Sequence, residues 1–217
     1  METKWLILTA LVFVIVIAAG ALVWRFGFYV APYAWTGEPA RLRDVLGIKP
    51  GSRVADIGAG DGALAIEMAR FVGANGTVYA TDISSESRTD IAERSSREQL
   101  PQVQVVAGAA DGTNLPERCC DAIYLRAVFH HIKNQRAFAR AIGAGVQPGG
   151  RVAIIDFPPG ALWFHGEDHG VTAETIIAAF ESAGMTLTQR IENWGGGMFL
   201  LRFEQVAAHK PTPPSSR

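Results

Sequence analysis

One segment limits the possible folds of this chain more than any other. The apolar run Val54-Ala-Asp-Ile57 passes directly into Gly58-Ala-Gly-Asp-Gly62, and a helical pattern follows. Glycines at such a junction permit a tight turn and let a ligand approach the backbone closely. The first N–H groups of the helix favour a carboxylate or a phosphate. The segment therefore predicts a strand, a ligand-binding loop and a helix, in that order.

Short apolar runs and helical patterns alternate after this segment. Strands are expected at 53–57, 77–81, 103–107, 122–126 and 151–156, and helices at 63–71, 86–99 and 135–145. A last helix, at 173–183, precedes two strands, 186–192 and 198–203, which a glycine turn at 195–197 joins. This order is typical of an α/β fold with a doubly wound, Rossmann-like, mostly parallel seven-stranded sheet that ends in an antiparallel hairpin.

The amino terminus has a different character. Residues 5–24 are uncharged and almost wholly apolar, and as a helix they would be long enough to cross the hydrocarbon core of a bilayer. We predict a transmembrane anchor over 1–26 and a juxtamembrane connector over 27–37. Positive charges after the apolar run outnumber Lys4 before it, which favours a single-pass membrane protein with a cytoplasmic main domain. The sequence Ala19-Gly-Ala21 also fits a cleaved signal peptide, and that alternative stays open.

Charge and cysteine content exclude two classes of protein. The chain has 20 Lys and Arg against 21 Asp and Glu, a formal net charge of −1, so no nucleic-acid partner is expected. The two cysteines, Cys119 and Cys120, are adjacent and cannot connect distant segments as a disulfide framework does. We expect one domain over 38–206, followed by a disordered tail over 207–217.

Three carboxylates lie in or after three strands of the predicted sheet. Asp56 precedes the glycines within the first strand, where a buried charge needs hydrogen-bond donors or a cationic ligand. Asp82 ends the second strand, where a carboxylate can accept both hydroxyls of a ribose. Asp111 follows the third strand and could accept an adenine amino hydrogen. Because parallel strands end at one edge of a sheet, the three should surround one ligand there.

Taken together, five stretches of the sequence resemble the class I S-adenosylmethionine-dependent methyltransferases. The resemblance covers residues 37–204, and its motifs are 49–62, 79–83, the Asp111 loop, 120–132 and 147–156. It implies S-adenosyl-L-methionine as the cofactor and methyl transfer to an acceptor as the reaction. The glycines alone would also suit an NAD-type oxidoreductase, but nothing else in the sequence supports that alternative.

The resemblance implies a role for each residue of the glycine loop. Gly58, Ala59, Gly60 and Gly62 would line the methionine and ribose portion of the cofactor. Asp56 would lie near the amino end of the cofactor.

Five more cofactor contacts follow from the same resemblance. Asp82 would bind the ribose hydroxyls, and Ile83 would pack on the adenine. Asp111, with Gly112 beside it, would bind the adenine amino group. Arg126, at the end of the fourth strand, would contact the methionine portion, although an arginine is less expected next to a sulfonium.

Two histidines, His130 and His131, follow the fourth strand and are the candidates for the acceptor site. An imidazole at this edge could deprotonate an oxygen or nitrogen acceptor or bind it. The alternative is that both rings pack at the start of the next helix and bond to backbone groups. The run Phe129-His-His-Ile132 is similar to quinone-pathway methyltransferases, and the apolar amino terminus suggests an acceptor in or near the membrane.

A metal site is not expected. His165, Glu167, Asp168 and His169 have the composition of a metal cluster, but the flanking glycines indicate a loop, in which this spacing is poorly suited to a metal. A non-catalytic, membrane-anchored scaffold that keeps the fold is the alternative to an enzyme.

Overall fold

A computed structural model describes residues 13–18, 20, 37–161 and 170–205. The chain divides into two compact units, Met1–Glu38 and Pro39–Arg217. Residues 13–18 are helical, but most of the predicted membrane anchor, the connector and the tail lie outside the described residues. Among the residues that are described, no helix combines the length and apolar character needed to cross a membrane.

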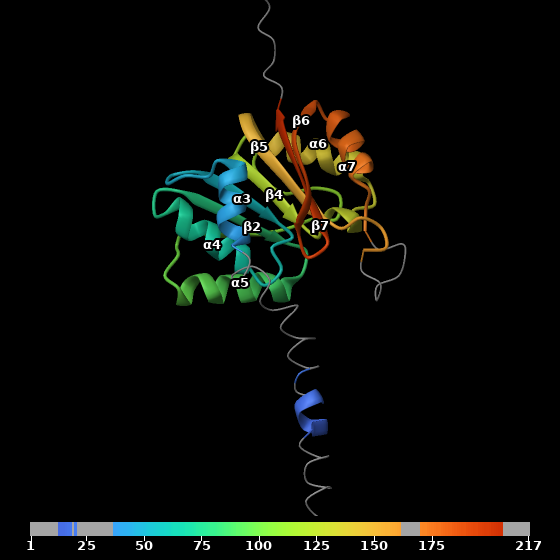
Figure 1. The fold of residues 1–217 in the computed structure, drawn as a ribbon. Helices are drawn as coiled ribbons and strands as arrows, with labels where there is room; N and C mark the ends of the chain where they lie inside the picture. Colours follow the sequence, from blue (N-terminus) through green and yellow to red (C-terminus); the bar gives the residue numbers. More distant parts are fainter. Residues whose placement is uncertain (1–12, 19, 21–36, 162–169, 206–217) are drawn as a thin grey trace, which may run out of the picture. The chain divides into compact units, whose positions relative to one another are not determined.

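Within the described part of the second unit, seven strands form one sheet in the order β3-β2-β1-β4-β5-β7-β6 (Figure 1). They are β1 (Arg53–Ile57), β2 (Thr77–Asp82), β3 (Val103–Ala107), β4 (Cys120–Arg126), β5 (Val146–Asp156), β6 (Met185–Gly195) and β7 (Met198–Gln205). Strands β1 to β5 pair in parallel, and β7 runs antiparallel to both β5 and β6. The predicted sheet and its closing hairpin are confirmed.

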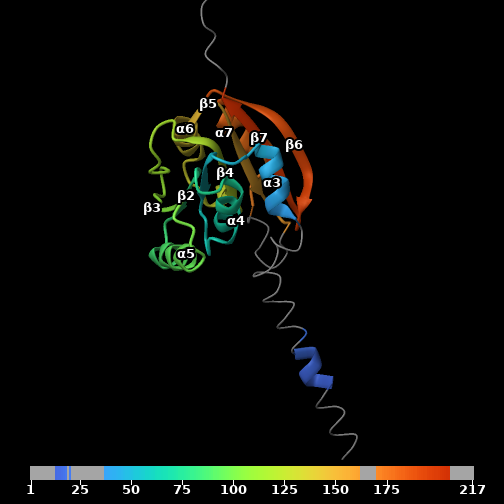
Figure 2. The same cartoon turned by 90° about the vertical axis from the view of Figure 1, so that its left-hand side faces the viewer.

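Helices cover both faces of the sheet (Figures 1 and 2). They are α3 (Glu38–Leu46), α4 (Ala63–Val72), α5 (Ser85–Arg97), α6 (Gln135–Gly145) and α7 (Ala173–Glu181). One apolar cluster joins α3, α4 and α5 to one face, and a second joins α6 and α7 to the other. This two-sided cover is what the alternation of strands and helices predicts.

Neighbouring residues of a strand belong to opposite layers. Val54 packs in the cluster that contains Met68 of α4, whereas Ala55 packs in the cluster of Phe138 and Phe180. Val54 and Ala55 are both fully buried. Because the side chains of a strand alternate between faces, a strand covered on both sides has to be apolar at every position. Asp56 breaks that rule, which marks it as a functional candidate.

Strand β5 differs from its prediction because it begins at Val146, five residues before the expected start at 151. The segment Gln147-Pro-Gly-Gly150 has the composition of a turn, yet it continues the strand. Pairing with β4 shifts register between Cys120 and Ala122, which accommodates the extra residues as a bulge. A Cβ at Gly150 would lie 2.9 Å from the carbonyl oxygen of Asp121, so only glycine permits this close approach.

The carboxyl ends of four strands meet at one edge of the sheet. Ile57 of β1 pairs with both Thr81 of β2 and Leu125 of β4, and Arg126 pairs with Ile155 of β5. The loops that follow these strands therefore start side by side, as in other doubly wound sheets, where ligands bind at this edge.

Candidate functional site

The glycine loop has a backbone that other residues would adopt only with strain. Gly58, Gly60 and Gly62 have φ angles of +73°, +57° and +73°. A Cβ at Gly58 would lie 2.5 Å from Val128 Cγ2, and one at Gly62 would lie 2.8 Å from Ile91. A Cβ at Gly60 would meet nothing within 4 Å. Gly58 and Gly62 are thus required by packing, whereas Gly60 leaves open space beside the loop.

Asp82 holds the loops after β1 and β2 together. Its Oδ2 accepts the N–H of Gly60 at 2.9 Å, and its Oδ1 accepts the N–H of Ser84 at 2.8 Å. The carbonyl oxygen of Thr81 accepts the N–H groups of Gly58 and Ala59 at 2.8 and 2.9 Å. Since each carboxylate oxygen can accept more than one hydrogen bond, Asp82 keeps the capacity to bind hydroxyl groups.

Asp56 is a buried acid next to this loop, with 2% of its surface exposed. The pKa of its carboxyl is raised from 3.8 to about 7, chiefly because burial disfavours the charged form, and the nearby charges of Asp82 and Asp61 act in the same direction. The Tyr124 side chain and the charge of Arg126 act in the opposite direction and lower the pKa. Among the described residues, its Oδ2 atom has no hydrogen-bond partner. Such a group is suited to a cationic ligand, which would stabilise its ionised form.

The predicted adenine contacts lie beside Asp82. Ile83 has 72% of its surface exposed, which is unusual for an isoleucine at an otherwise polar edge and fits an aromatic ring. The N–H of Gly108 donates to the carbonyl oxygen of Asp82 at 2.9 Å and brings the loop after β3 to the same place. Asp111 is exposed on that loop, and Gly112 follows it.

Arg126, the one predicted contact whose role the sequence left in doubt, ends β4. It pairs with Ile155 of β5 and lies close enough to Asp56 for its charge to lower the pKa of that carboxyl. Among the described residues, Asp56 is therefore one of the groups near Arg126.

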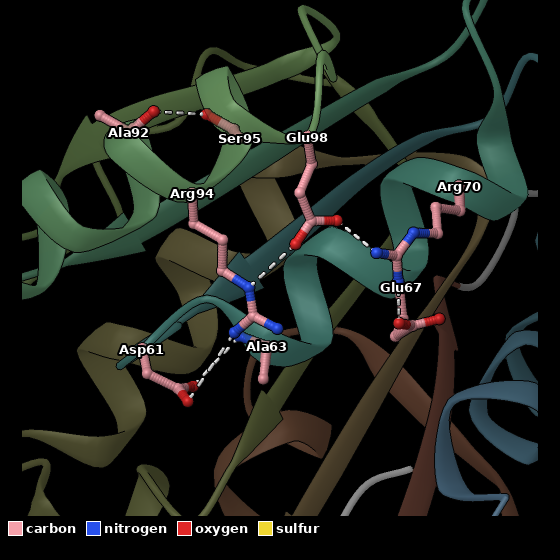
Figure 3. A network of polar contacts seen from close by, with 8 residues as sticks. All are labelled: Asp61, Ala63, Glu67, Arg70, Ala92, Arg94, Ser95 and Glu98. Atoms are coloured by element: carbon pink, nitrogen blue, oxygen red, sulfur yellow. Dashed lines mark hydrogen bonds and ion pairs between the residues drawn. The ribbon is translucent and has the colours of Figure 1, made fainter.

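A surface network of charged side chains begins at Asp61 in the glycine loop (Figure 3). Its members, in order of contact, are Asp61, Arg94, Glu98, Arg70 and Glu67. Asp61 Oδ1 accepts the N–H of Ala63 at 3.1 Å, at the start of α4, while its other oxygen lies 4.0 Å from Arg94 of α5. Because Gly62 has no side chain to cap α4, Asp61 supplies that hydrogen bond instead.

The two candidate histidines differ sharply in surroundings. They lie in the 3₁₀ turn η1 (Phe129–His131) after β4. His130 Nδ1 is 2.6 Å from Oδ1 of Asp156, the last residue of β5, and its N–H donates to Asp156 Oδ2 at 3.1 Å. The side chain of His130 is 4% exposed and that of Asp156 is 0% exposed. His131 is exposed, with its ring centroid 3.9 Å from that of His130.

Asp156 is the residue that sequence reasoning missed. It belongs to the motif 147–156, yet the sequence analysis gave it no role. The signal was present, because a polar residue ends an otherwise apolar strand here, as Asp82 does in β2.

The tract that contains His165, Glu167, Asp168 and His169 lies outside the described residues. Within the described part of the chain, no three His, Cys, Asp or Glu side chains are grouped so that they could hold a metal ion. Cys119 and Cys120 are buried as free thiols at the start of β4, away from the carboxyl edge.

Comparison with known proteins identifies the region that carries this site. Residues 55–154 match the family model of the methyltransferase domain. Residues 55–154 are thus similar to a methyltransferase domain. The crystal structure of a SAM-dependent methyltransferase from Aquifex aeolicus has the same fold, with a TM-score of 0.68 and 23% identity over 76% of this chain and 88% of that chain. Domain and fold together imply an enzyme that uses S-adenosylmethionine.

Two relatives extend the comparison to sequence. A stretch of 111 residues is 33% identical to the 2-phytyl-1,4-naphtoquinone methyltransferase of Nostoc punctiforme, covering 50% of this chain and 48% of that protein. A stretch of 116 residues is 27% identical to the ubiquinone/menaquinone biosynthesis C-methyltransferase UbiE of Vibrio cholerae, covering 52% and 44%. The methyltransferase domain thus spans about half the length of the curated relatives that it matches.

Proposed function

We propose that this methyltransferase domain transfers a methyl group from S-adenosylmethionine to a membrane-associated, quinone-like acceptor. The single observation that supports the cofactor half best is the arrangement around Asp82. One carboxylate fixes the N–H groups of Gly60 and Ser84 and keeps acceptor capacity for hydroxyl groups.

The residues at this edge fit each part of the cofactor. The unpartnered Oδ2 of Asp56 suits the ammonium group of the methionine portion. Asp82 suits the ribose hydroxyls, and the exposed face of Ile83 suits the adenine ring. The open space at Gly60 leaves room for a ligand beside the loop. Asp111 and Arg126 lie at the same edge and complete the predicted set.

The cofactor supplies an electrophilic methyl group. One bond forms from the acceptor to the methyl carbon while the methyl–sulfur bond breaks, its electron pair stays on sulfur, and one proton leaves the acceptor. Transfer of this kind depends on alignment and on exclusion of water. The chain has to hold the acceptor in line and receive or conduct its proton.

Three observations support a quinone-like acceptor near a membrane. Both curated relatives described above have names that state a quinone-pathway substrate. The run Phe129-His-His-Ile132 is similar to quinone-pathway methyltransferases. In the turn after β4, His130 provides an imidazole that could serve the acceptor. The apolar run 5–24 would hold the domain on the cytoplasmic side of a bilayer. Quinone-like acceptors dissolve in the bilayer, so the domain would lie close to them.

Titration of the full chain in mild detergent with S-adenosylmethionine tests the cofactor half. We expect saturable binding that Asp82→Ala abolishes. Lack of binding by the folded wild-type chain would favour a scaffold that only keeps the fold.

Methyl transfer to a reduced prenylated naphthoquinone tests the acceptor half, with labelled methyl groups counted in the extracted lipid. Transfer to protein or to water-soluble phenols instead would contradict the quinone-like acceptor.

A membrane-washing experiment tests the anchor. Carbonate-washed membranes should retain the full chain and lose a chain that lacks residues 1–26, and equal loss of both would contradict the anchor.

A further inference from the structure

We propose that Asp156 positions His130 as the group that accepts the proton of a hydroxyl-bearing, hydroquinone-type methyl acceptor. The proposal rests on the methyl-transfer function proposed above and identifies the residues that accept the proton in that reaction. Asp156 is the positioning residue, and His130 is the catalytic one.

Asp156 contacts both the backbone and the ring of His130. Its Oδ2 accepts the backbone N–H of His130 at 3.1 Å, and its Oδ1 lies 2.6 Å from the ring Nδ1. Oδ1 also accepts the N–H of Phe157 at 2.8 Å. Because two backbone N–H groups donate to this carboxylate, it acts as an acceptor toward the ring as well. We therefore assign the ring proton to Nδ1, which leaves Nε2 as the nitrogen that accepts a proton.

The turn that presents His130 is strained and firmly anchored. Ala127 has a φ of +55°, a left-handed conformation that alanine rarely adopts. Its N–H donates to the carbonyl oxygen of Ile155 at 2.8 Å, which ties the turn to β5. Phe129 is fully buried, and its ring centroid lies 5.7 Å from that of Phe180. Strain held in this way is common at functional sites.

The pair lies directly beside the glycine loop. Val128, between the strained alanine and His130, occupies the space that a Cβ at Gly58 would need. Strand β4 pairs with β1 on one side and with β5 on the other, so the turn after β4 and the end of β5 lie at the same edge of the sheet as the cofactor residues. Among the described residues, Asp156 on β5 and His131 on the same turn lie against the His130 ring.

This geometry suits an acceptor that must lose a hydroxyl proton before its ring carbon becomes nucleophilic. The proton passes from the acceptor oxygen to Nε2, and the resulting oxyanion directs electron density to the ring carbon that takes the methyl group. The methylated carbon then releases its own hydrogen as a proton to solvent, which restores the aromatic ring, and the oxyanion takes back the proton held on Nε2, so that one proton leaves overall. The Asp156 carboxylate stabilises the imidazolium formed, as a carboxylate does in other acid–base pairs.

Kinetics of the full chain test the proposal, with a reduced prenylated naphthoquinone as probe. We expect Asp156→Asn to lower kcat at least about tenfold and to leave the KM for S-adenosylmethionine within about twofold. His130→Gln should lower kcat about 100-fold and also leave that KM within about twofold. Asp121→Asn, which alters a carboxylate at the opposite end of β4 that accepts the N–H of Arg53, should change neither.

A spectroscopic measurement on the wild-type chain needs no acceptor. Long-range ¹H–¹⁵N correlation with ¹⁵N-histidine should show a proton on Nδ1 of His130, with the signals assigned from the His130→Gln variant. A proton on Nε2 would overturn the proposal even if Asp156→Asn failed to fold. An unchanged kcat in a folded Asp156→Asn would overturn it too, as would equal effects of Asp121→Asn. A wild-type chain that binds no S-adenosylmethionine would instead mark the failure of the proposed function itself.

Discussion

The ligand-binding edge has two halves, one formed mainly by backbone groups and the other mainly by side chains. The half after β1 and β2 consists largely of backbone, with left-handed glycines whose N–H groups bond to Thr81 and Asp82. The half after β4 and β5 consists of side chains, with the His130 ring held on Asp156. Backbone sites depend on where Cβ atoms are absent, whereas side-chain sites depend on charge and on ring orientation. The first half should therefore be sensitive to added bulk and the second to changes of chemistry.

The largest effect is expected from Gly58→Ala, which breaks the backbone half by bulk alone. The left-handed φ should cost about 1–2 kcal/mol, and the 2.5 Å approach to Val128 should add about 1–3 kcal/mol. The free energy of unfolding, measured in urea, should fall by about 2–5 kcal/mol. Gly60→Ala is the matched control, with the φ cost but no contact within 4 Å.

A double-mutant cycle with Val128→Ala separates the two costs of Gly58→Ala. Relative to Val128→Ala alone, the added alanine should cost only the φ term, about 1–2 kcal/mol. If Gly58→Ala lowers the free energy of unfolding as much in the Val128→Ala variant as in wild type, packing against Val128 is not what requires glycine at position 58.

Asp82→Ala should have the next largest effect, on binding. It removes the acceptor of two backbone N–H groups and the predicted partner of the ribose, so affinity for S-adenosylmethionine should fall at least about 100-fold by calorimetry. Asp90→Ala, on the exposed surface of α5, is the control and should bind as wild type does. Loss of less than about tenfold would mean that the loops keep their shape without the carboxylate.

These two halves also differ in how well the sequence predicted them. The glycine loop, Asp82 and Ile83 follow from local patterns, because each lies within a few residues of the strand end that places it. The contact of His130 with Asp156 joins residues that are 26 positions apart and depends on the pairing of β4 with β5. It also needs the left-handed turn at Ala127, which the residue type disfavours. No local pattern encodes either condition.

The third prediction uses pH to probe Asp56, the buried acid of the backbone half. Burial raises the pKa of Asp56 to about 7 from 3.8, so between these values the folded chain binds a proton that the unfolded chain has lost. The free energy of unfolding should therefore fall as pH rises from about 4 to about 7 and level off above that. Asp56→Asn should remove this dependence. Urea titrations at pH 5 and 8 measure it, and stability that rises with pH over this range in wild type relative to Asp56→Asn would contradict the assignment.

Cofactor affinity should show the opposite pH dependence. An ammonium group binds the ionised carboxyl, whose fraction rises about tenfold between pH 6 and pH 8 for a pKa of about 7. Calorimetry should find affinity up to about tenfold higher at pH 8. Because binding releases a proton at the lower pH, the measured binding enthalpy there should vary with the ionisation heat of the buffer. Equal affinity at both values would place the ammonium group elsewhere.

The smallest effect is expected from Arg94→Ala, which tests whether side chains also shape the backbone half. Arg94 is 31% exposed and lies 4.0 Å from an Asp61 that is 63% exposed, so the pair should contribute less than about 1 kcal/mol. Affinity for S-adenosylmethionine should fall no more than about twofold, and the difference should vanish at high salt because exposed charges are screened. Arg97→Ala, exposed on the same helix, is the control. A loss of tenfold or more would mean that the network in Figure 3 holds the glycine loop in place, and the contrast between a backbone half and a side-chain half would no longer stand.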